Sequence, residues 1–205
     1  MRSRLRLWLA AGTTSDDNPM SFFVTSHGVG NGADLGGLAG ADRHCQSLAT
    51  KAGAGHRSWR AYLSTQAQGD APAVHARDRI GRGPWRNAKG VVVASSVDAL
   101  HGSNTITKET ALTQDGLMVL GRGDTPNQHD ILTGSTAEGR ASDATCGNWT
   151  QSGEGAAMVG HHDRRGLDES DAAKSWNASH RSRGCSQQAL QSSGGAGLMY
   201  CFAVR

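Results

Sequence analysis

The chain has 205 residues, with 21 lysines and arginines against 18 aspartates and glutamates, so its formal charge is +3. This balance lacks the dense basic loading of nucleic-acid-binding proteins, and we expect no specific nucleic-acid partner. Hydrophobic residues make up 37% of the chain and 28 residues are glycine. Such a composition predicts one domain in which long, glycine-rich loops join short elements.

The N-terminal residues have the basic start of an export signal, but the apolar run that follows is only five residues long. A normal signal carries a longer apolar run. Residues 13–19 are polar and turn-rich, which is typical of a linker. We therefore expect a truncated signal-like segment and linker over residues 1–19, a single domain over residues 20–205, and no membrane span.

Two elements are expected early in the domain. A short β-type run covers residues 20–26 and leads into a glycine-rich loop, whose spacing fits a turn better than a phosphate-binding motif. The main helix is predicted over about residues 40–53, with Gly53 available to end it. Its apolar residues recur at helical spacing, at Ala41, Cys45, Leu48, Ala49 and Ala52.

Residues 58–64 alternate in polarity, which predicts a half-buried strand with Tyr62 and Arg60 on its outer side. Further strands are expected at residues 117–120 and 197–204. A basic stretch around Trp85 lies between the strands expected at residues 58–64 and 117–120. It could contact an acidic polymer, the alternative being an ordinary solvated face. Its arginines are Arg77, Arg79, Arg82 and Arg86.

The four cysteines are widely spaced and contain no C-x-x-C pair, which favours two disulfides over a zinc or redox motif. Disulfides place the domain in an oxidising compartment, so the protein is expected to be secreted, periplasmic or on the cell surface. Spacing alone leaves three pairings open.

Several segments share residues and order with a known family. They are residues 40–64, 133–140, 144–150, 184–185 and 198–202, and the specific part is the cysteine-bearing helix followed by Arg60-Ala-Tyr-Leu-Ser64. Together they resemble the endostatin-like domain at the C-terminus of collagens XV and XVIII, a relative of the C-type lectin fold. The glycine-rich loops point to a bacterial member.

The resemblance implies an α+β, C-type-lectin-like fold with short, mostly antiparallel strands and one main helix. It also implies nested disulfides, Cys45 with Cys201 and Cys146 with Cys185. The family's zinc site has no counterpart here. Ala178 stands where calcium-dependent lectins carry an aspartate, so we expect no standard calcium site for a sugar.

Trp149 and Trp176 are candidates for stacking on a sugar, each beside an amide, Asn148 or Asn177. The alternative is that both indoles pack in the core. Fixed loops on a rigid scaffold often bind ligands, so the expected ligand surface is the polar region 122–183.

The densest group of metal-ligating residues is His161-His162-Asp163, which makes a divalent metal the candidate cofactor. Adjacent histidines on an extended strand point in opposite directions, so both reach one ion only in an irregular backbone. His129-Asp130 could form an acid–base pair, but no nucleophile motif accompanies it.

We expect a non-catalytic, exported binding module that recognises a glycan or another cell-surface macromolecule. One alternative is a metal-dependent enzyme that uses His161, His162 and Asp163. The other is a structural envelope protein without a small ligand.

Overall fold

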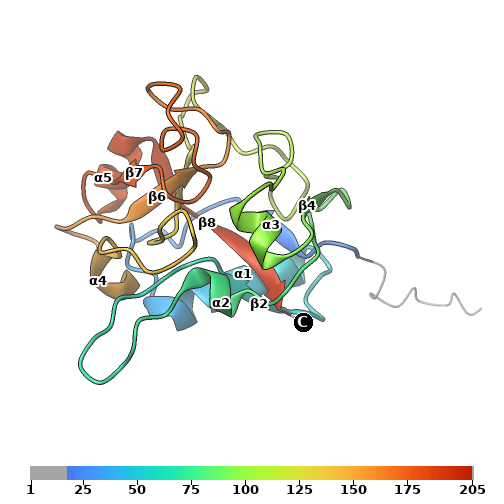
Figure 1. Ribbon diagram of the computed structural model, residues 1–205, viewed down its shortest axis with the longest axis horizontal. Coiled ribbons are helices and arrows are strands. Elements are labelled where there is room, and N and C mark those ends of the chain that lie inside the picture. The colour runs from blue at the N-terminus through green and yellow to red at the C-terminus, as the bar shows by residue number, and fades with distance from the viewer. Residues whose placement is uncertain (1–17, 205) are drawn as a thin grey trace, which may run out of the picture.

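The structure is a computed structural model that describes residues 18–204, so nearly all of the signal-like segment and linker predicted over residues 1–19 lies outside the described residues. The described chain is α+β (Figure 1). Its helices are α1 (Gly37–Lys51), α2 (Ala76–Arg79), α3 (Val97–His101), α4 (Cys146–Trp149) and α5 (Gln187–Ser193). Its strands are β1 (Phe22–Val24), β2 (Ser58–Ala61), β3 (Trp85–Arg86), β4 (Val92–Ala94), β5 (Asp130–Leu132), β6 (Met158–His161), β7 (His180–Arg181) and β8 (Gly195–Val204).

The main sheet is organised around β8, which runs through the middle of the molecule (Figure 1). The C-terminal half of β8 pairs antiparallel with both β1 and β2. Its N-terminal half pairs parallel with β5, and β6 and β7 continue the sheet antiparallel from there. The remaining strands, β3 and β4, form a separate pair.

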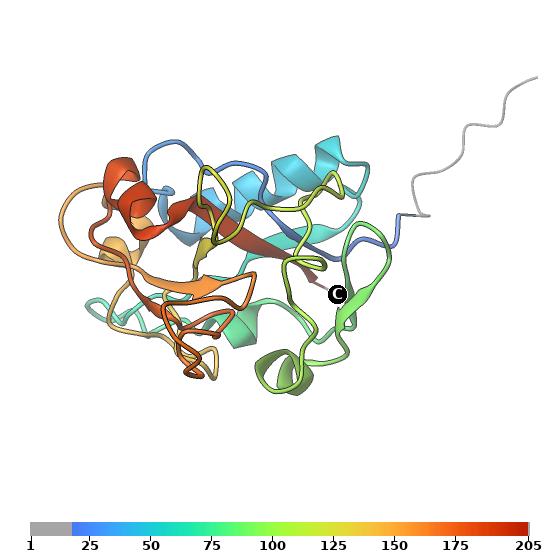
Figure 2. The ribbon, with the colours of Figure 1, turned by 90° about the horizontal axis from the view of Figure 1, so that it is seen from above.

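β8 is buried on both faces, which explains why its sequence is a continuous apolar run rather than an alternating one. Met199 and Cys201 point toward α1 and belong to one core cluster. Tyr200 and Phe202 point the other way, into a second cluster. Figure 2 shows α1 along one side of β8, with α2 and α3 toward the other.

The helix prediction is confirmed. α1 covers Gly37–Lys51, and Ala41, Cys45, Leu48 and Ala49 form its buried face. Its end follows from Gly53, whose φ of 78° lies in the left-handed region that glycine adopts without strain.

β2 shows the predicted alternation, but the strand ends at Ala61 and Tyr62 is buried rather than outward. The Tyr62 hydroxyl lies 2.7 Å from His101 Nε2 and accepts a hydrogen bond of 3.0 Å from Asn177 Nδ2. These partners satisfy its polar end inside the second cluster, and burial raises the pKa of Tyr62 well above its usual value.

The strand predicted at residues 117–120 is wrong. Leu117 and Met118 are 65% and 61% exposed, and Met118 makes only an isolated bridge to Leu112. The predictions for residues 20–26 and 197–204 are confirmed by β1 and β8.

Both disulfides have the nested pairing that the resemblance implied. Cys45–Cys201 joins α1 to β8 across 156 positions of sequence, and Cys146–Cys185 joins α4 to the segment after β7 across 39 positions. Among the described residues, no helix combines the length and the hydrophobicity that crossing a membrane requires.

Candidate metal centre

The register of β5, β6 and β7 brings polar residues to one end of the sheet. Asp130 in β5 is the cross-strand partner of His161 in β6. His180 in β7 is the partner of Val159, two positions before His161 and therefore on the same face. His129 immediately precedes β5, so the alternation of side chains along that strand does not fix the direction of its ring.

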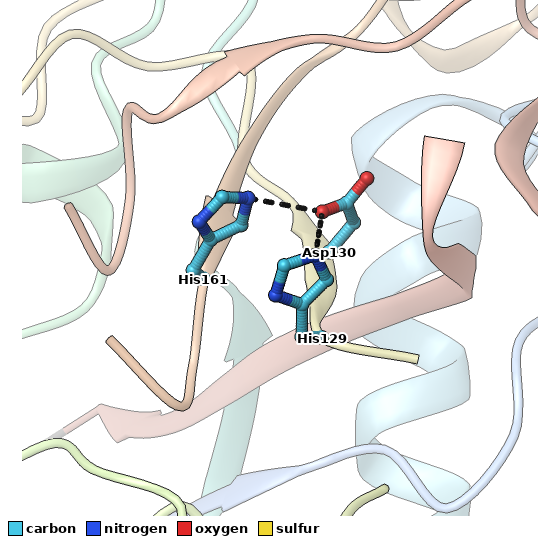
Figure 3. Close-up of side chains that lie close together, drawn as sticks. All are labelled: His129, Asp130 and His161. Carbon is cyan, nitrogen blue, oxygen red and sulfur yellow. Dashed lines mark ion pairs between the residues drawn. The ribbon is translucent and has the colours of Figure 1, made fainter. Parts of the chain in front are cut away.

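Three imidazoles converge on one carboxylate oxygen. The Nε2 atoms of His129, His161 and His180 lie 3.3, 3.2 and 3.4 Å from Asp130 Oδ1. Figure 3 shows the rings of His129 and His161 side by side, both turned toward that carboxylate. An ion about 2.0 to 2.1 Å from each of four tetrahedral ligands keeps the ligand atoms about 3.3 Å apart. The three spacings to Oδ1 match edges of such a tetrahedron, and the ligand atoms of His129, Asp130 and His161 all lie within 4.8 Å of one another. His180 lies outside that close group, so its ring would have to move toward the others to complete a tetrahedron.

The other ring nitrogen of each histidine has its own acceptor. His161 Nδ1 lies 2.7 Å from the carbonyl oxygen of Ala173, and His180 Nδ1 lies 3.0 Å from its neighbour's carbonyl oxygen. His129 Nδ1 lies 3.3 Å from Asp163 Oδ1. These acceptors can hold a proton on Nδ1, which leaves each Nε2 able to bind an ion on the side of Asp130, as in histidines that bind a metal.

Asp130 and His161 also contain buried polar atoms with no hydrogen-bond partner within residues 18–204: both carboxylate oxygens of Asp130, and His161 Nε2. The distances to Asp130 Oδ1 are short enough for ion pairs, but the angles do not make hydrogen bonds. A buried carboxylate without hydrogen-bond donors costs free energy. A cation held between these groups would satisfy all of them.

The electrostatics favour a cation as well. Burial acts to raise the pKa of Asp130, but the imidazoles of His161 and His180 outweigh burial and hold that pKa below its usual value. Burial is likewise outweighed at Asp163, where His129 and the backbone N–H of Arg122 keep the pKa of the carboxyl well below its usual value. Both carboxylates are therefore ionised at neutral pH.

The centre opens onto a cavity of about 540 Å³. His129 and His161 are each 3% exposed at their side chains, whereas His180 is 39% exposed. The cavity wall consists of these three histidines and of Arg122, Asn127, Leu167, Asp168, Ser170, Ala172, Ala173, Ser179, Arg181, Arg183 and Ser193. An ion at the centre would thus be accessible to a small ligand.

Comparison of the sequence with known protein families gives no match, and no curated protein matches it. The described chain has an α+β fold with two disulfides.

Of the metal ligands predicted from the sequence, the structure places only His161 at the centre. The ring of His162 points elsewhere and its Nε2 lies 3.1 Å from the carbonyl oxygen of Leu120, as strand alternation requires. Asp163 supports His129 instead of joining the ligands. The sequence analysis noticed His129-Asp130 only as an acid–base pair and missed His180.

The predicted sugar-stacking residues require a correction. Trp149 and Trp176 are 0% and 3% exposed, so neither indole presents a face to a ligand. Trp149 Nε1 donates a hydrogen bond of 2.8 Å to the carbonyl oxygen of Ser64. Asn177 is also buried, and Asn148 holds the Gln66 backbone through bonds of 2.8 and 3.1 Å. The alternative of packing in the core is the one observed.

The four arginines proposed for an acidic polymer do not form one exposed surface. Arg82 and Arg86 are exposed, but Arg77 is paired with Asp98 at 3.2 Å. Arg79 is buried, and its two Nη atoms donate to the two oxygens of Asp42 at 3.1 and 2.7 Å. The same guanidinium donates to the carbonyl oxygen of Ala61 at 2.5 Å, so Arg79 is structural.

Replacing Arg79 with alanine should destabilise the fold by about 2 to 3 kcal/mol, because it leaves the Asp42 carboxylate without its cationic partner and removes one of the donors to the buried carbonyl oxygen of Ala61. The loss of stability should be smaller than for a fully buried ion pair, because the Asp42 side chain is 25% exposed. Urea unfolding of Arg79→Ala beside Arg82→Ala measures it. A loss as small as that of the exposed arginine would show that the pair adds nothing.

Proposed function

We propose that this protein is an extracellular, metal-dependent binding module of the C-type-lectin-like kind. Its ion is held by His129, Asp130, His161 and His180 and takes part in binding the ligand. The observation that carries the proposal is the convergence of three Nε2 atoms, at 3.2 to 3.4 Å, on a buried carboxylate that lacks hydrogen-bond partners among the described residues.

The ligand set indicates the metal. The imidazoles of His129 and His161 and the carboxylate of Asp130, with His180 beside them as a fourth ligand, suit Zn²⁺, which takes four nitrogen, sulfur or oxygen ligands, whereas Ca²⁺ and Mg²⁺ favour oxygen ligands in larger number. Cu²⁺ would also bind such nitrogen ligands, but it favours a flatter arrangement. We therefore assign the centre to Zn²⁺.

The cavity supports a binding role. Its volume of about 540 Å³ is in the range of small-molecule sites. Its serines and Asn127 offer hydrogen bonds to hydroxyl groups, as a glycan requires, and its wall comes from residues 122–183 together with Ser193. The two disulfides support a location on the cell surface or outside the cell.

The cavity wall favours binding over hydrolysis. A zinc hydrolase uses a carboxylate or another base to take a proton from the attacking water. Asp168 is the one carboxylate among the residues that form this wall within the described chain, and its Oδ1 accepts 2.9 Å from the backbone of Ser170. Asp168 is exposed and is not one of the groups that meet at Asp130 Oδ1.

The test begins with elemental analysis of the purified protein and zinc titration of chelator-treated protein by calorimetry. We expect one zinc per chain, and binding on a glycan array that disappears with chelator and returns with zinc. Substoichiometric metal or chelator-insensitive binding would contradict the proposal. Hydrolysis of arrayed compounds in the presence of zinc would instead support the enzyme alternative, and a blank array would favour a structural role.

A further inference from the structure

We infer that the ligand carries an oxyanion, a carboxylate or a phosphate, which Arg122 and Arg183 bind beside the metal. This inference depends on the proposed function, because it assigns the chemical class of the ligand in the same cavity. It concerns groups that the metal centre itself does not use.

The cavity wall is strongly asymmetric in charge. Arg122, Arg181 and Arg183 contribute three guanidinium groups, against the single carboxylate of Asp168. A divalent ion at the centre would be balanced by the carboxylates of Asp130 and of Asp163, which lies behind His129, so the excess positive charge of the wall comes from its arginines. Such a wall attracts an anion and leaves arginines unpaired if the ligand is a neutral sugar.

Two of the three arginines are available for a ligand. Arg181 already forms an ion pair with Asp143. Within residues 18–204, the guanidinium groups of Arg122 and Arg183 make no ion pair and no hydrogen bond, although the backbone N–H of Arg122 donates to Asp163 Oδ2 at 2.6 Å.

Asp163 links the position of Arg122 to the metal centre. Its Oδ2 accepts the backbone N–H of Arg122 at 2.6 Å, and its Oδ1 lies 3.3 Å from Nδ1 of the ligand His129. Gly121 packs so closely that a Cβ there would lie 2.6 Å from Asp163 Oδ2. Arg183, on the other segment, follows the ligand His180 by three positions. Arg122 is thus connected to the ligand His129 through hydrogen bonds to Asp163, and Arg183 lies close to the ligand His180 in sequence.

The chemistry of an oxyanion fits this arrangement. One oxygen can bind Zn²⁺ while the others accept from a guanidinium, whose planar fork matches carboxylate and phosphate groups. Leu167 is 90% exposed and lies in the same wall, where it can contact an apolar part of the ligand.

The test uses the zinc-loaded protein and calorimetry with glucose 6-phosphate, glucuronate, glucose and inorganic phosphate as probes. We expect a charged sugar to bind at least about 10-fold more tightly than glucose, since hydrogen bonds to charged groups are the stronger ones. Preference for the phosphate or for the carboxylate identifies the source of the oxyanion.

The double variant Arg122→Gln/Arg183→Gln should lose about 10- to 100-fold in affinity for the charged probe and keep its zinc affinity. Arg82→Gln changes an exposed arginine outside the cavity wall and should leave both affinities unchanged. If wild-type protein binds no zinc, the proposed function fails. If zinc binds but no charged probe is preferred, or the double variant matches Arg82→Gln, the oxyanion inference alone is overturned.

Discussion

Replacing His161 with alanine should lower the affinity for Zn²⁺ by more than about 100-fold, because loss of a residue that only supports a ligand already costs about 10- to 100-fold. Zinc at about 1,000 times its Kd should stabilise the wild-type fold by about 4 kcal/mol. In a domain of this size that raises Tm by roughly 8 to 16 °C. Thermal unfolding with and without zinc should show this rise in the wild type and almost none in the variant.

Three further variants make the result specific. His56→Ala removes an exposed histidine and should keep the full rise in Tm. His162→Ala should lower stability because it empties a buried site, yet retain zinc binding. Asp163→Asn should weaken zinc binding by about 10- to 100-fold through His129. Equal zinc losses in His161→Ala and His162→Ala would contradict the assigned centre.

Removing the Cys45–Cys201 disulfide should lower the free energy of unfolding by about 5 kcal/mol, since the bond closes a very long loop and restricts the unfolded chain. The bond spans 156 positions and both cysteines are fully buried. Urea unfolding of Cys45→Ala/Cys201→Ala, compared with the wild type without reductant, measures the difference.

The second disulfide provides the matched control. Cys146–Cys185 spans 39 positions, so Cys146→Ala/Cys185→Ala should cost about 4 kcal/mol, less than the first pair. It should also weaken zinc binding more than the first pair does, because Cys185 anchors the segment that carries His180. A greater stability loss from the second pair would contradict the loop-length argument.

Local patterns in the sequence predicted the elements whose environment is simple. α1 has one buried face, so its apolar period was visible, and Gly53 marked its end. Residues 117–120 looked equally strand-like, but within the described chain they have no partner strand, and Leu117, Met118 and Leu120 are exposed while Val119 packs into the second cluster. Tyr62 lies in an otherwise alternating segment and is buried because His101 and Asn177, distant in sequence, satisfy its hydroxyl.

The candidate metal centre was less predictable because it depends on strand register. Asp130 and His161 meet only because β5 pairs with β6, and His180 joins them through the β6–β7 pairing. Strand alternation did indicate that His161 and His162 could not easily share an ion. It could not indicate which distant residues would replace His162.

The central position of β8 has a consequence for the order of folding. β8 follows every other described strand in the chain, yet β1, β2 and β5 all pair with it. These pairings cannot form on the ribosome before residues 195–204 have been synthesised, and such long-range contacts form slowly. The emerging chain therefore remains without its central strand, and the Cys45–Cys201 disulfide can close only after that strand has been made.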